Sequence, residues 1–217
     1  MKTIITNSRV NGKIMTEEKR QLLKREISEI MKGKGKERAN DIQYIVEYIK
    51  EKEGENGFND LVKELEEYDF KLPDVDKLNS MEWVPRFVPR VFLIGAIRFF
   101  DWTQEEVFEM GRRVVASFSS IKFLLKWFPS SKNTITMAIN NWNKYSTQGE
   151  ANLISFDKKN KKCILEVKNF DIQPVITIYY EGIFAKIIEI ATGSKKVKIK
   201  ETENKNEHKY HKFIIKW

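Results

Sequence analysis

The hydrophobic pattern of this sequence changes its period once, at Gln148-Gly149, and this change constrains the fold most. Before it, apolar residues recur every three to four positions, as they do in amphipathic helices. After it, residues 150–156 and 161–168 alternate apolar and polar side chains, as strands with one buried face do. The polar residues 157–160 between them have the length of a hairpin turn. The C-terminal part therefore begins with a predicted hairpin.

A predicted helix and a second pair of strands complete this C-terminal unit. Pro174 opens the helix and Gly193 closes it, because proline suits the first turn of a helix and glycine suits its end. Residues 195–201 and 209–217 follow as strands. In the last strand, alternation puts four residues on the core side: His211, Phe213, Ile215 and Trp217. The sequence thus predicts a strand-strand-helix-strand-strand unit whose final strand lines the core.

The residues before Gln148 predict helices. Helical spacing of apolar residues marks six segments: 16–31, 40–54, 58–68, 85–99, 103–129 and 133–145. The fold class that follows is α+β, with a helical layer packed on a small antiparallel sheet built from the C-terminal ββαββ unit. Residues 32–36 alternate lysine and glycine and predict a hinge. We therefore expect a basic N-terminal arm with one helix at 1–35 and an α+β domain at 36–217.

Charge is distributed unevenly along the chain. The net charge of +8 divides into +6 for residues 1–40 (eleven basic, five acidic), −9 for 41–110 (eight, seventeen) and +11 for 111–217 (twenty, nine). A uniformly basic nucleic-acid binder would not carry so acidic a middle, although a basic face is compatible with it. Lysine runs at 158–162 and 195–200 fall on a turn and a strand of one predicted sheet. If neighbouring, they would hold phosphates; otherwise they guard edge strands against unwanted pairing.

The single cysteine, Cys163, excludes an internal disulfide and a metal site built from several cysteines. Its apolar neighbours predict an ordinary strand residue. No apolar run reaches the roughly eighteen residues that a membrane helix needs. The segment Met1-Lys2-Thr3-Ile4-Ile5-Thr6-Asn7 has no apolar signal core. We therefore expect a cytoplasmic protein without a membrane span.

Motifs of catalysis are absent from the sequence, which has no Gly-rich phosphate loop, no G-x-S-x-G, no H-E-x-x-H and no C-x-x-C. Carboxylates are plentiful, but we expect examples such as Glu64, Glu66 and Glu67 to lie on solvated helix faces. Such faces do not pair a general acid with a general base. The sequence predicts no enzymatic activity.

Three short segments resemble a known superfamily. They are Trp83-Val84-Pro85 before the apolar helix, Met110-Gly111-Arg112 on the next helix, and the last segment, residues 210–217, which ends in Trp217. With the order of helices and hairpins over 36–217, they resemble the 4-vinyl reductase-like and haem-NO-binding-like superfamily, which also includes core subunits of the transport protein particle tethering complex. The resemblance implies a ligand-binding-like α+β domain and, as in the tethering relatives, a homodimer.

Departures from the family pattern concern the metal and the haem. Metal-binding members carry a glycine and a cysteine in the final hairpin, where this chain has Glu207 and His211. Haem-binding members use a histidine in the helical region and a Tyr-x-Ser-x-Arg motif, whereas both histidines here, His208 and His211, are C-terminal and no such motif occurs. We expect neither haem nor a cysteine-bound metal, and no cofactor. His208 and His211 are secondary metal candidates, and the strand phase favours a structural role for both.

The aromatic residues and arginines of the helices supply the candidate ligand site. Such side chains can line an apolar pocket with a cationic mouth, and the candidates are Trp83, Arg86, Phe87, Arg112, Trp142 and Tyr145. The alternative is that the aromatic residues are core and the arginines solvated. We predict a non-enzymatic domain that binds or senses a small apolar or lipid-like molecule and acts through a protein partner. The alternatives are a structural dimerisation or tethering module without ligand, and nucleic-acid binding through the basic sheet face.

Overall fold

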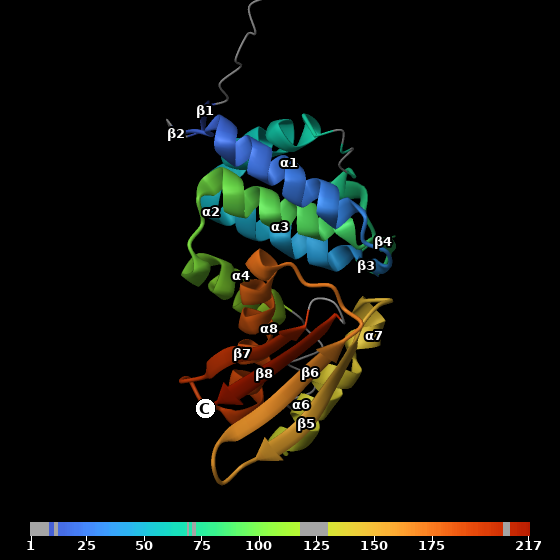
Figure 1. Ribbon diagram of the computed structural model, residues 1–217, viewed down its shortest axis with the longest axis vertical. Coiled ribbons are helices and arrows are strands. Elements are labelled where there is room, and N and C mark those ends of the chain that lie inside the picture. The colour runs from blue at the N-terminus through green and yellow to red at the C-terminus, as the bar shows by residue number, and fades with distance from the viewer. Residues whose placement is uncertain (1–8, 11–12, 69, 71–72, 118–129, 206–208) are drawn as a thin grey trace, which may run out of the picture. The chain divides into compact units, whose positions relative to one another are not determined.

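The computed structural model describes residues 9–10, 13–68, 70, 73–117, 130–205 and 209–217 (Figure 1). The chain forms two compact units. Unit 1 comprises Met1–Lys34 and Ala39–Thr103, and unit 2 comprises Gly35–Arg38 and Gln104–Trp217. Helices and small antiparallel sheets together make this an α+β fold, as the sequence predicts.

Unit 1 is built around the helices α1 (Glu17–Met31) and α3 (Phe87–Phe100), which pack against each other (Figure 1). The hydroxyl oxygen of Thr16 caps α1 by accepting a hydrogen bond from the Lys19 backbone N–H at 3.4 Å. Leu23, Ile27 and Ile30 form the buried side of α1. This confirms the helix predicted at 16–31. Two short strands precede it, β1 (Arg9–Val10) and β2 (Lys13–Ile14), which pair antiparallel.

The second helix of unit 1, α2 (Ala39–Glu66), combines two segments that the sequence predicts as separate helices. Gly54 interrupts its helical geometry with φ of 79°, a left-handed value that glycine adopts without strain. The C-terminal half of α2 packs on α3 where Gly95 leaves room for Leu61 and Leu65. The 3₁₀ turn η1 (Val75–Lys77) and the strand β4 (Trp83–Pro85) follow α2 in the chain.

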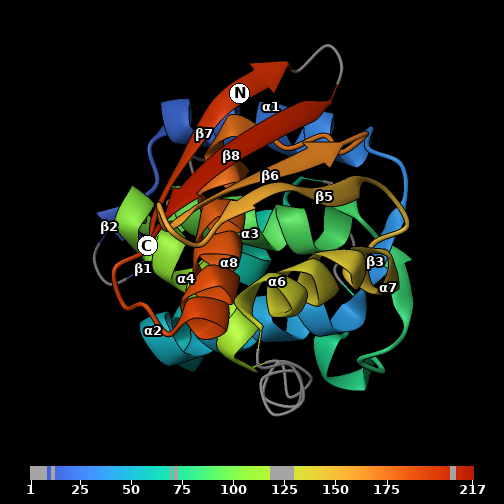
Figure 2. The same ribbon diagram turned by 90° about the horizontal axis from the view of Figure 1, so that it is seen from below.

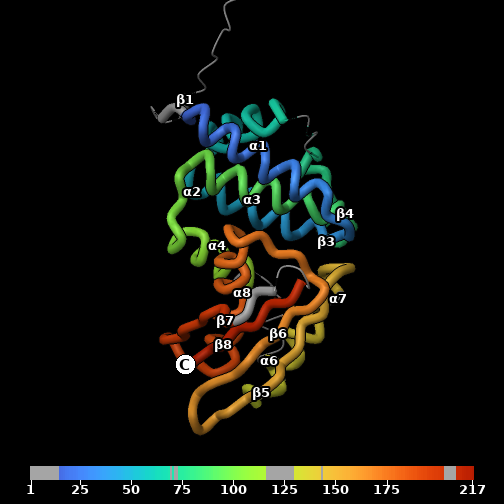
Figure 3. Tube along the Cα trace, in the orientation of Figure 1, coloured from blue at the N-terminus to red at the C-terminus, as the bar shows by residue number. Residues whose placement is uncertain are grey.

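Unit 2 contains the four-stranded antiparallel sheet predicted from the change of period. Its strands are β5 (Glu150–Asp157), β6 (Lys162–Lys168), β7 (Lys198–Lys205) and β8 (Tyr210–Lys216). Their order is β5-β6-β8-β7, so the last strand inserts between β6 and β7 (Figures 2 and 3). The prediction that the third strand begins at Lys195 is wrong, because the Lys196 backbone N–H bonds to the Ser194 hydroxyl in a turn before β7.

The helices of unit 2 are α4 (Gln104–Ser117), α6 (Ser131–Asn140), α7 (Trp142–Tyr145) and α8 (Pro174–Thr192), with the short strand β3 (Lys36–Arg38) beside them. The helix predicted over 133–145 is broken at Asn141. The second half of the helix predicted over 103–129 lies outside the described residues. Helices α6 and α8 lie on one side of the sheet (Figure 2).

The inner face of the sheet is the side that α6 and α8 cover, and it carries the core of unit 2. Its buried residues are Cys163, Leu165, Val167, His211, Phe213 and Ile215. The predicted phase of the last strand is therefore correct for His211, Phe213 and Ile215, whereas Trp217 is half-buried and stacks on Phe156 with ring centroids 5.4 Å apart. No helix within the described residues is long and apolar enough to cross a membrane.

Candidate functional site

The six predicted ligand-site residues divide between the units. Trp83, Arg86 and Phe87 lie in unit 1, at β4 and the start of α3. Arg112, Trp142 and Tyr145 lie in unit 2, on α4 and α7.

The unit 1 set combines aromatic rings with buried cationic side chains. Arg86 and Arg90 are 3% and 5% exposed, so the alternative of solvated arginines does not hold at the start of α3. Phe87 meets Phe70 edge to face at 5.8 Å between ring centroids, and Trp83 is half-buried. A buried guanidinium needs hydrogen-bond acceptors, because its charge is costly to remove from water. This set therefore places buried guanidinium groups next to apolar surface.

A second buried charge in unit 1 is Glu64, which the sequence placed on a solvated face. Its carboxylate accepts hydrogen bonds from Arg20 Nη2 at 3.2 Å and from the Tyr68 hydroxyl at 2.8 Å. Glu64 is only 4% exposed. Burial, followed by the hydrogen bond to Glu64, raises the pKa of Tyr68. The prediction of a solvated Glu64 was wrong, because a helix can bury a carboxylate where a second helix supplies a cationic partner such as Arg20.

The unit 2 set includes a tightly packed tryptophan. The Trp142 indole N–H donates to the Gln148 carbonyl at 3.0 Å. Its ring lies edge to face on Phe170, with centroids 4.8 Å apart, and also contacts Tyr180 and Phe184. Tyr145, three residues further along α7, is half-buried. Trp142 is therefore a half-buried residue of unit 2 that packs on three aromatic rings and has a satisfied N–H group.

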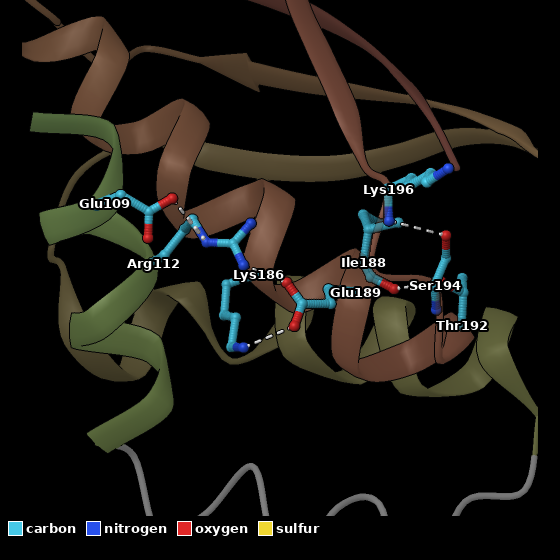
Figure 4. A network of polar contacts seen from close by, with 8 residues as sticks. All are labelled: Glu109, Arg112, Lys186, Ile188, Glu189, Thr192, Ser194 and Lys196. Atoms are coloured by element: carbon cyan, nitrogen blue, oxygen red, sulfur yellow. Dashed lines mark hydrogen bonds and ion pairs between the residues drawn. The ribbon is translucent and has the colours of Figure 1, made fainter. Parts of the chain in front are cut away.

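Arg112 joins α4 to α8 through a polar network (Figure 4). Its Nη2 donates to Glu189 Oε2 at 2.6 Å, and its Nε lies 3.3 Å from Glu109 Oε1 on its own helix. Lys186 Nζ donates to the other carboxylate oxygen of Glu189 at 2.8 Å. Burial alone would raise the pKa of Glu189, but Lys186 and Arg112 outweigh it and hold that pKa below its ordinary value. Arg112 therefore ties two helices together.

His211 lies within the core of unit 2, 1% exposed. Its Nδ1 is 2.7 Å from Glu201 Oε1 and its Nε2 is 3.0 Å from the Phe170 carbonyl oxygen. The Glu201 backbone N–H donates to Glu181 at 3.1 Å. Among the described residues, no three His, Cys, Asp or Glu side chains are grouped to hold a metal ion. His208, the other metal candidate, lies outside the described residues.

The two lysine runs lie on one sheet but not on adjacent strands. The run at 158–162 occupies the β5–β6 turn and the start of β6, and the run at 195–200 precedes and enters β7. Strand β8 lies between β6 and β7 and contributes Lys216. Strand β8 therefore lies between the strands that carry the two runs, and this position could not be predicted from the order of the strands in the sequence.

The chain has an α+β fold with one helical unit and one unit in which helices pack on a sheet of order β5-β6-β8-β7. Solved structures have the same fold. No protein-family model and no curated protein matches the sequence. A Cs H-NOX mutant with 4-cyano-L-phenylalanine has a TM-score of 0.61 at 13% identity, over 82% of this chain and 95% of that one. An S. oneidensis H-NOX protein in the Fe(II)NO state has a TM-score of 0.60 at 11% identity, over 82% and 98%. Unliganded Fe(II) H-NOX from K. algicida has a TM-score of 0.58 at 12% identity, over 82% and 95%. The chain has the haem-NO-binding fold.

Neither His211 nor Cys163 fits the role of a haem ligand. Haem iron is commonly held by a histidine nitrogen or a cysteine thiolate. Both ring nitrogens of His211 already lie within hydrogen-bond distance of Glu201 and the Phe170 carbonyl. Cys163 is fully buried in β6, where burial raises the pKa of its thiol to about 12, so it is not a thiolate at neutral pH. This chain keeps the fold without a placed His or Cys ligand in its described part.

Proposed function

We propose that the chain is a non-enzymatic sensory or ligand-binding domain that binds a small apolar or lipid-like molecule in place of haem and acts through a protein partner. The observation that carries this proposal is the likeness to haem-NO-binding structures over 82% of the chain at a TM-score of about 0.6. The His211 geometry supports the replacement of haem, because neither ring nitrogen is available to iron.

The ligand contacts that we propose within unit 1 are those of Trp83, Arg86 and Phe87. The aromatic rings would contact the apolar part of the ligand. A buried guanidinium such as that of Arg86, 3% exposed, recognises a carboxylate or another anionic head through charge-assisted hydrogen bonds. An apolar molecule with one acidic group is therefore the ligand class that this set of residues supports. For Arg112, Trp142 and Tyr145 in unit 2, the packing and ion pairs support a structural role.

Native mass spectrometry of the purified protein tests the proposal. An additional mass, retained under native conditions and lost on denaturation, is the expected result, and titration with hemin should not produce the sharp absorption band of protein-bound haem. Arg86→Gln should lower the retained fraction, whereas Arg113→Gln, a matched change at an exposed arginine of α4, should not. Protein that carries no additional mass and binds hemin with a sharp haem band overturns the proposal.

Four finer expectations extend the proposal. We place the chain nearest the 4-vinyl reductase-like members of the superfamily, with the ligand-binding domain at 36–217, on the segments that carry the resemblance. We propose a homodimer in the cytoplasm, where a buried free thiol such as that of Cys163 stays reduced. Light scattering coupled to size exclusion measures the oligomeric state. A dimer that never retains ligand would favour the structural module instead.

A further inference from the structure

Three lysines lie side by side across the sheet of unit 2. The strand register pairs Lys162 on β6 with Lys216 on β8, and Lys216 with Lys198 on β7. Neighbouring strands lie about 4.8 Å apart. The lysines therefore form one transverse row over three adjacent strands. This row joins the two lysine runs of the sequence through a residue that belongs to neither run.

The next transverse row is apolar at its centre. Ile164 pairs with Ile214, and Ile214 pairs with Lys200. Because side chains alternate along a strand, these residues share a face with the lysine row, opposite the buried Cys163, Leu165, Phe213 and Ile215. We call this side, opposite α6 and α8, the outer face, with members Lys162, Ile164, Lys198, Lys200, Ile214 and Lys216.

Guarding an edge strand does not account for this arrangement. Lysines on edge strands prevent pairing with other chains, and Lys198 and Lys200 on the edge strand β7 fit that role. Lys162 and Lys216, however, lie on β6 and β8, each of which is already paired on both sides. Like charges directly opposite each other destabilise a sheet. The lysine row therefore destabilises the sheet, and the protection of an edge strand does not explain why lysines stand at these positions.

The nearest carboxylates in the register offset only part of this charge. Asp157 pairs with Lys162 in the register, but its oxygens accept hydrogen bonds from the Asn160 backbone N–H at 2.9 Å and from Asn160 Nδ2 at 2.7 Å. Those bonds, and to a smaller extent the charge of Lys162, hold the pKa of Asp157 below its usual value. Glu166 accepts from Lys168 at 2.7 Å and from the Tyr210 hydroxyl at 2.9 Å. In the register, Lys198, Lys200 and Lys216 lie opposite lysine or isoleucine and not opposite a carboxylate.

We propose that the outer face docks an acidic, amphipathic segment of a partner protein, with apolar side chains on the isoleucines and carboxylates on the lysines. An apolar centre with a charged rim is how protein interfaces are built, and charge complementarity selects an acidic partner. Single-stranded nucleic acid fits less well, because it needs aromatic side chains for base stacking where this face has Ile164 and Ile214. The docking surface does not depend on the small ligand proposed above.

A synthetic helical peptide tests the proposal on the full chain. The peptide has about 18 residues, roughly 27 Å of helix, with leucine along one face and glutamate along the other. A scrambled peptide of the same composition and an oligo-dT serve as comparisons. Fluorescence anisotropy should show binding of the amphipathic peptide that weakens with salt. The double variant Lys198→Gln/Lys216→Gln should raise its Kd about tenfold, since each exposed ion pair contributes modestly.

A matched variant separates this face from general charge. Lys158→Gln/Lys159→Gln removes the same charge from exposed residues of the β5–β6 turn and should leave the Kd unchanged. Relief of the lysine repulsion should keep or raise the melting temperature of Lys198→Gln/Lys216→Gln, so loss of binding would not reflect unfolding. Equal binding of the scrambled peptide, preference for oligo-dT, or equal losses in the two double variants would overturn the proposal.

Discussion

Gly111 on α4 and Gly182 on α8 are the positions at which the two helices of unit 2 pass each other backbone to backbone. A Cβ atom at Gly111 would lie 2.0 Å from the Tyr179 carbonyl oxygen on α8. A Cβ atom at Gly182 would lie 2.1 Å from the Phe108 carbonyl oxygen on α4. Both distances are far inside van der Waals contact, so only glycine permits this crossing. The Met110-Gly111-Arg112 segment that carried the family resemblance thus has a packing role.

Replacement of either glycine by alanine should destabilise the protein. Alanine gains about 1 kcal/mol in helix propensity over glycine, but the added methyl group must force the helices apart, and overpacking costs about 1–3 kcal/mol or more. We expect a net loss in the free energy of unfolding for Gly111→Ala and for Gly182→Ala, measured by urea denaturation. The double variant should lose less than the sum, because the first substitution already separates the helices. Additive losses in the free energy of unfolding, or a gain in either single variant, would contradict the close approach of α4 and α8 at these glycines.

The hairpins and the last strand could be predicted from the sequence because their information is local. Alternation alone put His211, Phe213 and Ile215 on the buried face, as the structure confirms. The insertion of β8 between β6 and β7 could not be predicted, since it depends on pairing between strands far apart in sequence. The lysine row follows from that pairing and was hidden for the same reason.

The ion pair between Glu189 and Arg112 gives a second prediction. Glu189→Gln removes the carboxylate that accepts from Arg112 and Lys186, and should cost about 1–2 kcal/mol because the pair is partly buried. Glu109→Gln is the matched control: Glu109 also pairs with Arg112, but its side chain is 56% exposed, so the loss should stay below about 0.5 kcal/mol.

The pH dependence of the Glu189 pair has a definite sign. Its folded pKa is lowered from the ordinary 4.5, so its stabilising contribution is present above that value and is lost as pH falls through the folded pKa. Thermal melts across acidic pH should therefore converge for the wild type and Glu189→Gln. A difference that persists at the lowest pH at which the protein folds would show that the charge is not the cause.

Glu181 gives a third prediction, in which stability depends on pH in the opposite direction from Glu189. Burial, followed by the nearby Glu201 charge, raises the pKa of Glu181, although the Glu201 backbone N–H opposes this. A raised carboxyl pKa means that the folded state takes up its proton first, so stability falls as pH rises from the ordinary value through the folded pKa. Glu181→Gln keeps an oxygen for the Glu201 N–H and removes the buried charge. It should raise the melting temperature near about pH 8 and lose that advantage near about pH 4. An equal rise in melting temperature at both pH values would contradict the raised pKa of Glu181.

Candidate site residues were harder to predict than strands, because burial of a charge depends on its partner. The pattern put Glu64 on a solvated face and left open whether the arginines line a pocket or are solvated, whereas the structure buries Glu64, Arg86 and Arg90. In the case of Glu64, the missing information was Arg20, which lies on another helix. His211 is the converse case: its strand phase was predictable, whereas its contact with Glu201 depends on the register between β7 and β8, which shifts between Glu201 and Glu203.

His211 and Glu201 give the last prediction, because each satisfies the other within the core. His211→Leu would leave the Glu201 carboxylate and the Phe170 carbonyl without the imidazole, and we expect a loss of about 2–4 kcal/mol in the free energy of unfolding. Glu201→Gln alone should also destabilise the protein. In the His211→Leu background, Glu201→Gln should cost at least about 1 kcal/mol less than it does alone, because the charge that it removes has already lost its partner. Urea denaturation of the four proteins in this cycle measures the coupling. Strictly additive losses would show that the 2.7 Å contact between Nδ1 and Oε1 contributes no stability, and would remove the argument that His211 is committed to the core.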